Sequence, residues 1–245
     1  MDGPVIQKIH KSILYHCKNL FCNGRFILKL LRSDTQRKHV FRWIFSLKQN
    51  YLFDTPYPWL VFDAVDYIQP RLFKGMNVFE YGSGGSTLFW LYYGSNVVSI
   101  EHNPQWYDLM KKKITSNQPI DYRLIIPDST KHNNLGFDPS NPENYVSAND
   151  LYRAYEFGNY VTQIDVYPDG HFDLIVIDGR ARPSCIKHSI KKVKIGGYII
   201  LDNSDREYYL TKTNIYLKNF FKVEFYGAIP GNTFFSKTNI YMKLK

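Results

Sequence analysis

Residues 77–85 read Asn-Val-Phe-Glu-Tyr-Gly-Ser-Gly-Gly, and this stretch decides the fold. Its apolar residues predict a buried strand over 77–81, which runs into a turn at the glycines. Glycine has no Cβ, so the backbone there can turn sharply and come close to a ligand. A helix is expected to begin at Ser86 and Thr87. A strand, a glycine turn and a helix N-terminus in this order are typical of nucleotide sites in open α/β sheets.

Two acids near this turn narrow the class of ligand. A dinucleotide fingerprint, Gly-x-Gly-x-x-Gly, would need a third glycine where the chain has Thr87. A pyrophosphate would also face the carboxylate of Glu80, whereas a ligand with an amino group and a positive charge would be attracted to it. Glu101 closes the next predicted strand, 96–101, where a carboxylate can accept both hydroxyl protons of a ribose.

Strands and helices alternate along the rest of the sequence. Short apolar runs predict further strands at about 122–126, 173–178 and 197–202. The two segments around Pro230-Gly231 predict an antiparallel hairpin at the sheet edge, with strands at 219–226 and 232–243. The predicted fold class is therefore α/β, with a Rossmann-like open sheet that is mostly parallel and ends in an antiparallel hairpin.

At these positions the chain resembles the class I S-adenosylmethionine-dependent methyltransferases, over residues 75–245. The family's first motif, acid-x-Gly-x-Gly, is matched by Glu80, Gly82 and Gly84. Five parallel strands followed by a hairpin match the family's seven-stranded sheet. The resemblance implies S-adenosylmethionine as the cofactor, with Glu101 on the ribose hydroxyls, His102 beside the adenine ring and Asp128 on the adenine amino group. The implied cofactor-binding set is Glu80, Gly82, Ser83, Gly84, Glu101, His102, Asp128 and Asp178.

Polar residues also follow the fourth and fifth predicted strands. Asp178, Asp202 and Asn203 present two carboxylates and one amide oxygen, which suits a hard divalent ion such as Mg²⁺ or Ca²⁺. This set resembles the metal triad of the catechol and caffeoyl-CoA O-methyltransferase branch. The alternative is structural: Asp202 and Asn203 would cap the following helix, and Asp178 would orient Arg180 or Arg182. The sequence leaves both interpretations open.

The expected reaction is O-methylation of a small or glycan-like hydroxyl compound. A metal ion would stabilise the oxyanion of the acceptor, and without metal Asp178 or His188 would act as the catalytic base. Arg180 and Arg182 would pair with an anionic substrate, with the cofactor carboxylate or with neighbouring acids. Two alternatives remain. The formal net charge of +9 prompts an RNA-directed methyltransferase, and a catalytically silent scaffold would keep the same fold.

Composition and periodicity predict the domain organisation. Residues 1–70 are expected to form a basic, helical N-terminal appendage, and residues 71–245 the methyltransferase domain. An insertion at about 127–171, with a helix near 148–164, interrupts that domain. The appendage would cover the active site, or would contact a membrane surface or form a homodimer. Three cysteines without a pairing motif, no signal peptide and no transmembrane segment predict a cytoplasmic protein, with peripheral membrane contact as the alternative.

Overall fold

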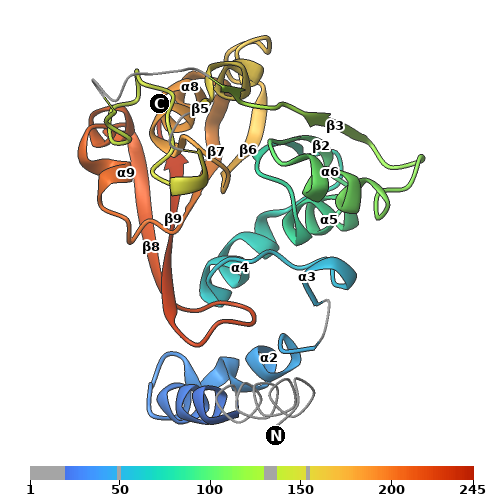
Figure 1. Ribbon diagram of the computed structural model, residues 1–245, viewed down its shortest axis with the longest axis vertical. Helices are drawn as coiled ribbons and strands as arrows, with labels where there is room; N and C mark the ends of the chain where they lie inside the picture. Colours follow the sequence, from blue (N-terminus) through green and yellow to red (C-terminus); the bar gives the residue numbers. More distant parts are fainter. Residues whose placement is uncertain (1–19, 49–50, 130–136, 153–154) are drawn as a thin grey trace, which may run out of the picture.

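The computed structural model describes residues 20–48, 51–129, 137–152 and 155–245. Within them, a seven-stranded sheet runs in the order β3-β2-β1-β6-β7-β9-β8 (Figure 1). Its strands are β1 (Asn77–Tyr81), β2 (Asn96–Glu101), β3 (Ile120–Leu124), β6 (Phe172–Ile177), β7 (Val193–Asp202), β8 (Phe220–Ala228) and β9 (Phe235–Lys243). Each of the seven was predicted within a few residues of these bounds, so the predicted α/β fold class is confirmed.

The strand order reverses next to β1. This strand pairs in parallel with β2 on one side and with β6 on the other. In open α/β sheets such a reversal opens a crevice at the carboxyl ends of the strands, and ligands bind there. β7 continues the parallel part of the sheet, whereas β9 lies antiparallel between β7 and β8 and forms the predicted hairpin.

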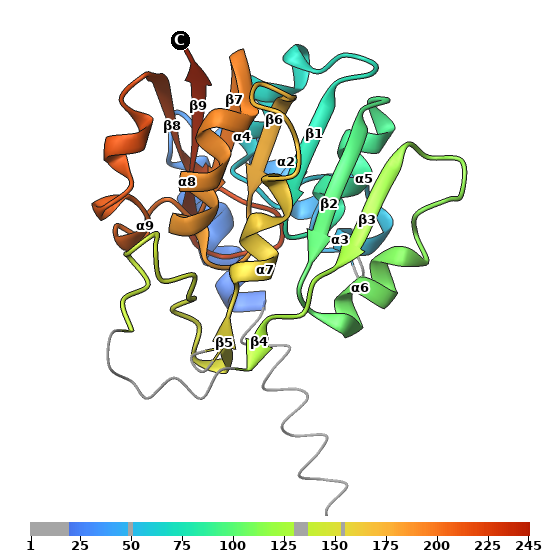
Figure 2. The same cartoon turned by 90° about the horizontal axis from the view of Figure 1, so that it is seen from above.

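Helices cover both faces of the sheet, as Figure 2 shows. α4 and α5 pack on one face, and α7 and α8 pack on the other. Residues of β1 alternate between the two cores, since Val78 belongs to the α5 side and Phe79 to the α8 side. The helices are η1 (Arg37–His39), α2 (Val40–Phe45), α3 (Tyr51–Asp54), α4 (Phe62–Ile68), η2 (Gln69–Arg71), α5 (Gly85–Tyr92), α6 (Pro104–Lys111), η3 (Asp150–Tyr152), α7 (Gly158–Val161), η4 (Thr162–Ile164), α8 (Arg182–Lys192), α9 (Tyr208–Thr211) and η5 (Asn214–Leu217).

The N-terminal segment packs against the turn of the C-terminal hairpin. Residues 20–31 are helical, and Phe26 and Trp43 are buried against the hairpin end. Trp43 Nε1 donates to the carbonyl oxygen of Asn232 at 2.7 Å, and the Gly231 N–H donates to Ser46 Oγ at 2.8 Å. The N-terminal segment therefore packs against the loop between β8 and β9. Residues 1–19 of the predicted appendage lie outside the described residues.

Part of the N-terminal surface is apolar. The exposed large side chains on helix 20–31 and on α2 are Leu20, Phe21, Leu28, Leu31, Phe41, Ile44 and Phe45. No helix among the described residues has the length and apolar character that a membrane span requires. The homodimer and the peripheral membrane contact would both use this apolar surface, and they stay predictions.

The insertion differs from its prediction. One helix was expected near 148–164, but that prediction is wrong before residue 158, where the described residues form η3 and the short strand β5 (Tyr155–Glu156). β5 pairs antiparallel with β4 (Asp128–Ser129). The physical reason is the pattern of burial: apolar residues recur at helical spacing only from Phe157 to Ile164, which pack into the α8-side core.

Candidate functional site

A cleft of about 590 Å³ lies at the carboxyl ends of β1, β2, β6 and β7. Its walls come from the glycine turn after β1, the end of β2, the turn after β6 and the loop that joins β8 to β9. This is the position at which the strand order reverses, so the cleft occupies the place that the topology provides for a ligand. The predicted site residues that line it are Gly82, Ser83, Glu101, His102, Asp178, Asp202 and Asn203.

Glu101 lies at the floor of the cleft and is held there as a carboxylate. It is 3% exposed. Its Oε1 accepts from the backbone N–H groups of His102 and Asn103, both at 2.8 Å. Burial raises the pKa of Glu101, but the contacts with His102 and the two backbone N–H groups outweigh it and hold the pKa below its usual value. The group is therefore an anion at neutral pH, as an acceptor for sugar hydroxyls must be.

Ser83 joins the glycine turn to Glu101. Its backbone N–H and its Oγ donate to Glu101 Oε2 at 3.1 and 3.2 Å, and its Oγ lies 2.7 Å from the Tyr122 hydroxyl. Trp106 Nε1 donates to the Ser83 carbonyl at 2.8 Å. Trp106 also lines the cleft, and the sequence interpretation missed it. The sequence did contain a signal for Trp106, because Asn103 followed by proline is typical of a helix start. Trp106 therefore lies in the first turn of α6, where its backbone N–H donates to Asn103 Oδ1.

Glu80 lies beneath the turn and does not line the cleft. Its side chain points to the α5 side of the sheet and is fully buried. Trp90 Nε1 donates to it at 3.0 Å, Ser99 Oγ donates at 2.7 Å, and Thr87 Oγ1 donates as well while accepting from the Gly84 N–H. Glu80 therefore ties α5 and β2 to the glycine turn. Burial raises the pKa of Glu80 to about 7, against the effect of these hydrogen bonds.

Replacing Glu80 with glutamine is expected to flatten the pH dependence of stability. The folded pKa of about 7 exceeds the ordinary value of 4.5, so the folded state keeps a proton that the unfolded chain loses. The contribution of Glu80 to the free energy of unfolding is therefore full at low pH and is lost as pH rises through about 7. The total loss is on the order of 3 kcal/mol. Urea unfolding between pH 5 and 8 should show a fall for the wild type and a smaller fall for Glu80→Gln.

The matched control for this prediction is Glu224→Gln. Glu224 is an exposed acid whose pKa is lowered by its contacts with Lys222 and Lys237, so it stays ionised throughout this pH range. The control should leave the slope between pH 5 and 8 unchanged. Equal slopes for the wild type and Glu80→Gln would contradict the assignment of a protonated Glu80 in the folded protein.

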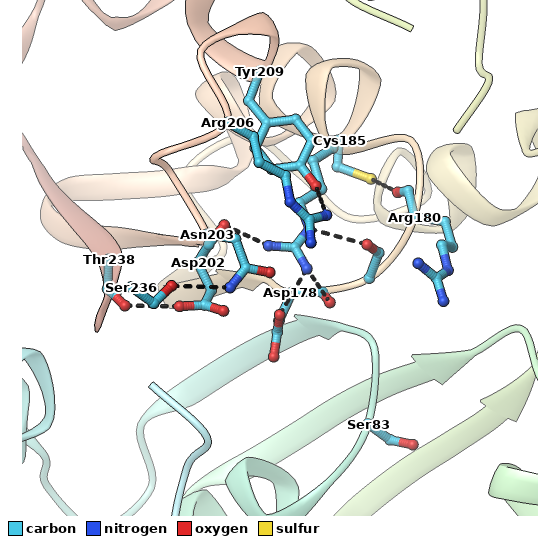
Figure 3. A network of polar contacts seen from close by, with 12 residues as sticks. Ser83, Asp178, Arg180, Cys185, Asp202, Asn203, Arg206, Tyr209, Ser236 and Thr238 are labelled. Carbon is cyan, nitrogen blue, oxygen red and sulfur yellow. Dashed lines mark hydrogen bonds and ion pairs between the residues drawn. The ribbon is translucent and has the colours of Figure 1, made fainter. Parts of the chain in front are cut away.

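A buried arginine organises the other side of the cleft, where Figure 3 labels its neighbours Asp178, Asp202 and Asn203. Arg182 is 5% exposed. Its Nη2 donates to Asp178 Oδ1 at 2.8 Å, its Nε donates to the Gly179 carbonyl at 3.0 Å, and its Nη1 donates to the Asp202 carbonyl. Thr238 Oγ1 donates to Asp202 Oδ1 at 2.7 Å. One guanidinium thus joins the turns that follow β6 and β7.

The two carboxyl groups of this network titrate as a pair. Burial, and after it the charge of Asp178, raises the pKa of Asp202 to about 7. Burial also raises the pKa of Asp178, against the opposing charge of Arg182. The Asp178 side chain keeps 28% of its surface exposed. Asp178 is therefore a carboxyl group at the cleft surface with a raised pKa, which is the property that a general base requires.

These residues do not fit the divalent ion that the sequence suggested. A cation between Asp178 and Asp202 would stand beside the fixed guanidinium of Arg182, which already donates to Asp178. Asn203 directs its amide nitrogen to Ser236 Oγ at 3.3 Å. The network matches one part of the structural alternative, in which Asp178 orients Arg182. The other part is wrong, because the N-cap of the following helix, α9, is Glu207 and not Asp202 or Asn203. A site for Mg²⁺ or Ca²⁺ at Asp178, Asp202 and Asn203 has no support from this network.

Comparison with known proteins identifies the fold. No family model and no curated protein matches the sequence. Solved structures do match, among them a provisionally assigned O-methyltransferase from Klebsiella pneumoniae, with a TM-score of 0.52 and 12% identity over 91% of this chain and 96% of that one. The chain has the class I methyltransferase fold. A provisionally assigned rRNA methylase from Clostridium thermocellum matches with a TM-score of 0.50 and 13% identity over 75% of this chain and 94% of that one.

Besides Glu80, three further predicted site residues do not line the cleft. Gly84 lies in the turn, and a Cβ built on it would lie 3.9 Å from the Trp106 ring. Asp128 is exposed in β4, where it accepts from Asn159 Nδ2 at 3.0 Å. His188 lies on α8, with Nδ1 2.8 Å from Asp165 and Nε2 3.2 Å from the Tyr145 hydroxyl. Both ring nitrogens of His188 have partners outside the cleft, so Asp178 is the better placed of the two predicted bases.

Proposed function

We propose that the protein binds S-adenosylmethionine in the cleft and transfers its methyl group to a hydroxyl oxygen of a small or glycan-like compound. The observation that carries this proposal is the pairing of Ser83 and Glu101 across the carboxyl ends of β1 and β2. It supports an anionic acceptor for ribose hydroxyls directly beside a turn that a nucleoside can approach. The class I methyltransferase fold agrees with this ligand.

Different residues of the cleft would contact different parts of the cofactor. Glu101 accepts two backbone N–H groups on Oε1, and the backbone N–H and the hydroxyl of Ser83 on Oε2. A ribose hydroxyl would take the place of the Ser83 hydroxyl, which lies at 3.2 Å and can turn to Tyr122 instead. His102 and Trp106 line the same cleft, and their rings are flat groups against which an adenine ring could stack. When bound, S-adenosylmethionine supplies a methyl carbon that is electrophilic because it sits on a positive sulfur. The protein has to align the acceptor oxygen with that carbon and exclude water.

Asp178 is the proposed catalytic base. It would take the proton of the acceptor hydroxyl, while Arg182 keeps its carboxylate in one orientation through Oδ1. Asp202 lies behind it in the same network and modulates its basicity through the coupled titration. The scheme uses no metal ion, since a cation between Asp178 and Asp202 would stand beside the guanidinium of Arg182.

The RNA-directed alternative has one observation in its favour beyond the net charge of +9. One of the structural matches described above is provisionally assigned as an rRNA methylase, although a likeness at 13% identity concerns the fold alone. An RNA substrate would make affinity fall steeply with salt, because neutralised phosphates release counterions. Binding of a short RNA that does not weaken between 50 and about 200 mM salt would count against this alternative.

Calorimetric titration tests the cofactor proposal. S-adenosylmethionine and S-adenosylhomocysteine are expected to bind the wild type. Gly84→Val is expected to abolish binding, because its side chain would project toward Trp106, which lines the cleft. A Cβ at Gly84 would meet nothing nearer than Trp106 at 3.9 Å, so this variant should fold. Gly24→Val is the matched control, since a Cβ there meets no atom within 4 Å and the residue lies in helix 20–31.

Three results would contradict the proposal. The first is that neither ligand binds the folded wild type, which would also favour a silent scaffold. The second is that Gly84→Val binds as tightly as the wild type while keeping its melting temperature. The third is that Gly24→Val loses binding as well, because the effect would then not be specific to the turn.

A further inference from the structure

A second pocket adjoins the cofactor cleft. It has a volume of about 530 Å³ and shares Gly179, Arg180, Arg182 and Arg206 with the cleft. Residues 146–151 of the insertion form another part of its wall, and Tyr208 and Tyr209 of α9 complete it. The three arginines thus lie where the two spaces meet, next to the proposed base Asp178.

The pocket has an excess of positive charge. Within the described lining, the three arginines face a single carboxylate, that of Asp150. Arg182 is balanced by Asp178. In the part of the chain that the structure describes, neither Arg180 nor Arg206 forms an ion pair with a carboxylate. Arg180 and Arg206 therefore carry an unbalanced positive charge where the two spaces meet, which would attract an anion.

The two unbalanced arginines are held by neutral groups that leave donors free. Arg180 Nε donates to His102 Nε2 at 3.2 Å, and its guanidinium lies 5.2 Å from the centre of the Tyr152 ring. Arg206 Nη1 donates to the Tyr209 hydroxyl at 2.9 Å. Figure 3 shows Arg206 beside Tyr209 on one side of the network and Arg180 on the other. A guanidinium has five N–H donors, so each arginine keeps several for a ligand.

We propose that the second pocket binds the methyl acceptor and that this acceptor is a small hydroxyl compound carrying a phosphate group, such as a sugar phosphate. The inference rests on the proposed function, since it names the substrate class of that reaction. Phosphate fits better than a carboxylate because it offers three acceptor oxygens and nearly two negative charges to two separate guanidinium groups. Asn149 and Asp150 line the same wall and are polar groups for the acceptor's other hydroxyls.

Calorimetric titration of the full chain with inorganic phosphate and with glucose 6-phosphate tests this inference, with glucose as the uncharged comparison. Both phosphates are expected to bind, and to bind also when S-adenosylhomocysteine saturates the cleft. Arg206→Met and Arg180→Met should each weaken phosphate binding roughly tenfold or more, because a charge-assisted contact is lost. Arg206→Lys should restore part of it. Lys218→Met, on the surface beside η5, is the matched control and should change nothing.

The outcomes separate this inference from the proposed function. If S-adenosylhomocysteine displaces phosphate and the arginine variants lose S-adenosylhomocysteine instead, the arginines hold the cofactor carboxylate and the inference is wrong. Phosphate binding that is absent, or equal in the wild type and in both methionine variants, also overturns it. Tight binding of a short single-stranded RNA, with no binding of either small phosphate, would show that Arg180 and Arg206 bind RNA, and the inference would be wrong. Failure of the cofactor proposal appears separately, as absent S-adenosylhomocysteine binding.

Discussion

Replacing Asp178 with asparagine is expected to lower turnover by about 10²–10⁴-fold while leaving S-adenosylmethionine affinity nearly unchanged. Asparagine has almost the same shape and still accepts the Arg182 hydrogen bond through its oxygen, but it cannot take a proton from the acceptor. The measurement is transfer of a labelled methyl group to the best acceptor in a panel of hydroxyl compounds, at saturating cofactor. Affinity is measured by calorimetry on the same preparation.

The pH profile of the wild type should agree with this assignment. Burial and the Asp178 charge raise the pKa of Asp202 to about 7, so the pair keeps one proton below that pH and loses it above. Turnover should therefore rise as pH passes through about 7, and Asp202→Asn should shift or remove this rise. A base that titrated near the ordinary value for aspartate would instead give a flat profile over this range.

Asp205→Asn is the matched control for Asp178→Asn. Asp205 lines the same cleft, but among the described residues its carboxylate accepts a hydrogen bond only from Ser236 Oγ, at 3.5 Å, outside the Arg182 network. Its replacement should leave turnover within a few-fold of the wild type. Full activity of Asp178→Asn would rule out Asp178 as the base. Loss of wild-type activity in EDTA, restored by Mg²⁺, would show that the metal interpretation was set aside in error.

The sheet and one half of the site could be predicted because their signals are local. Alternating or continuous apolar runs mark the strands, and the carboxyl ends of parallel strands share one edge whatever their side chains contact. Ser83 and Glu101 were therefore expected together, and the structure joins them directly. The same reasoning placed Asp178 and Asp202 at neighbouring strand ends, where they interact.

Side-chain direction could not be predicted from spacing. Glu80 is only two residues before Gly82, yet the pleat turns its carboxylate to the α5 side, where Trp90 and Ser99 donate to it. The sequence also could not show whether a metal ion or an arginine lies beside Asp178 and Asp202. Ala181 has a left-handed backbone with φ of 47°, and it turns the chain so that Arg182 folds back over the preceding strand end. No pattern in the sequence predicts this left-handed turn at Ala181.

Replacing Gly82 with alanine is expected to destabilise the fold by about 4 kcal/mol or more. Gly82 has a φ of +90°, which L-residues rarely adopt. A Cβ at this position would also lie 2.9 Å from the Cα and from the backbone nitrogen of Gly179, where only backbone atoms could move. The turns after β1 and β6 touch here, so the clash falls on the two turns that shape the cleft. Urea unfolding of the purified variant measures the loss.

Gly75→Ala separates the two causes of this loss. Gly75 has a nearly equal φ of +83°, but a Cβ there would meet no atom within 4 Å. It should cost only the backbone strain, about 1–2 kcal/mol. The difference between the two variants then measures the close approach of the two turns. If both variants lose the same small amount, the turns do not touch in solution, and the cleft is wider than the distance between Gly82 and Gly179 implies.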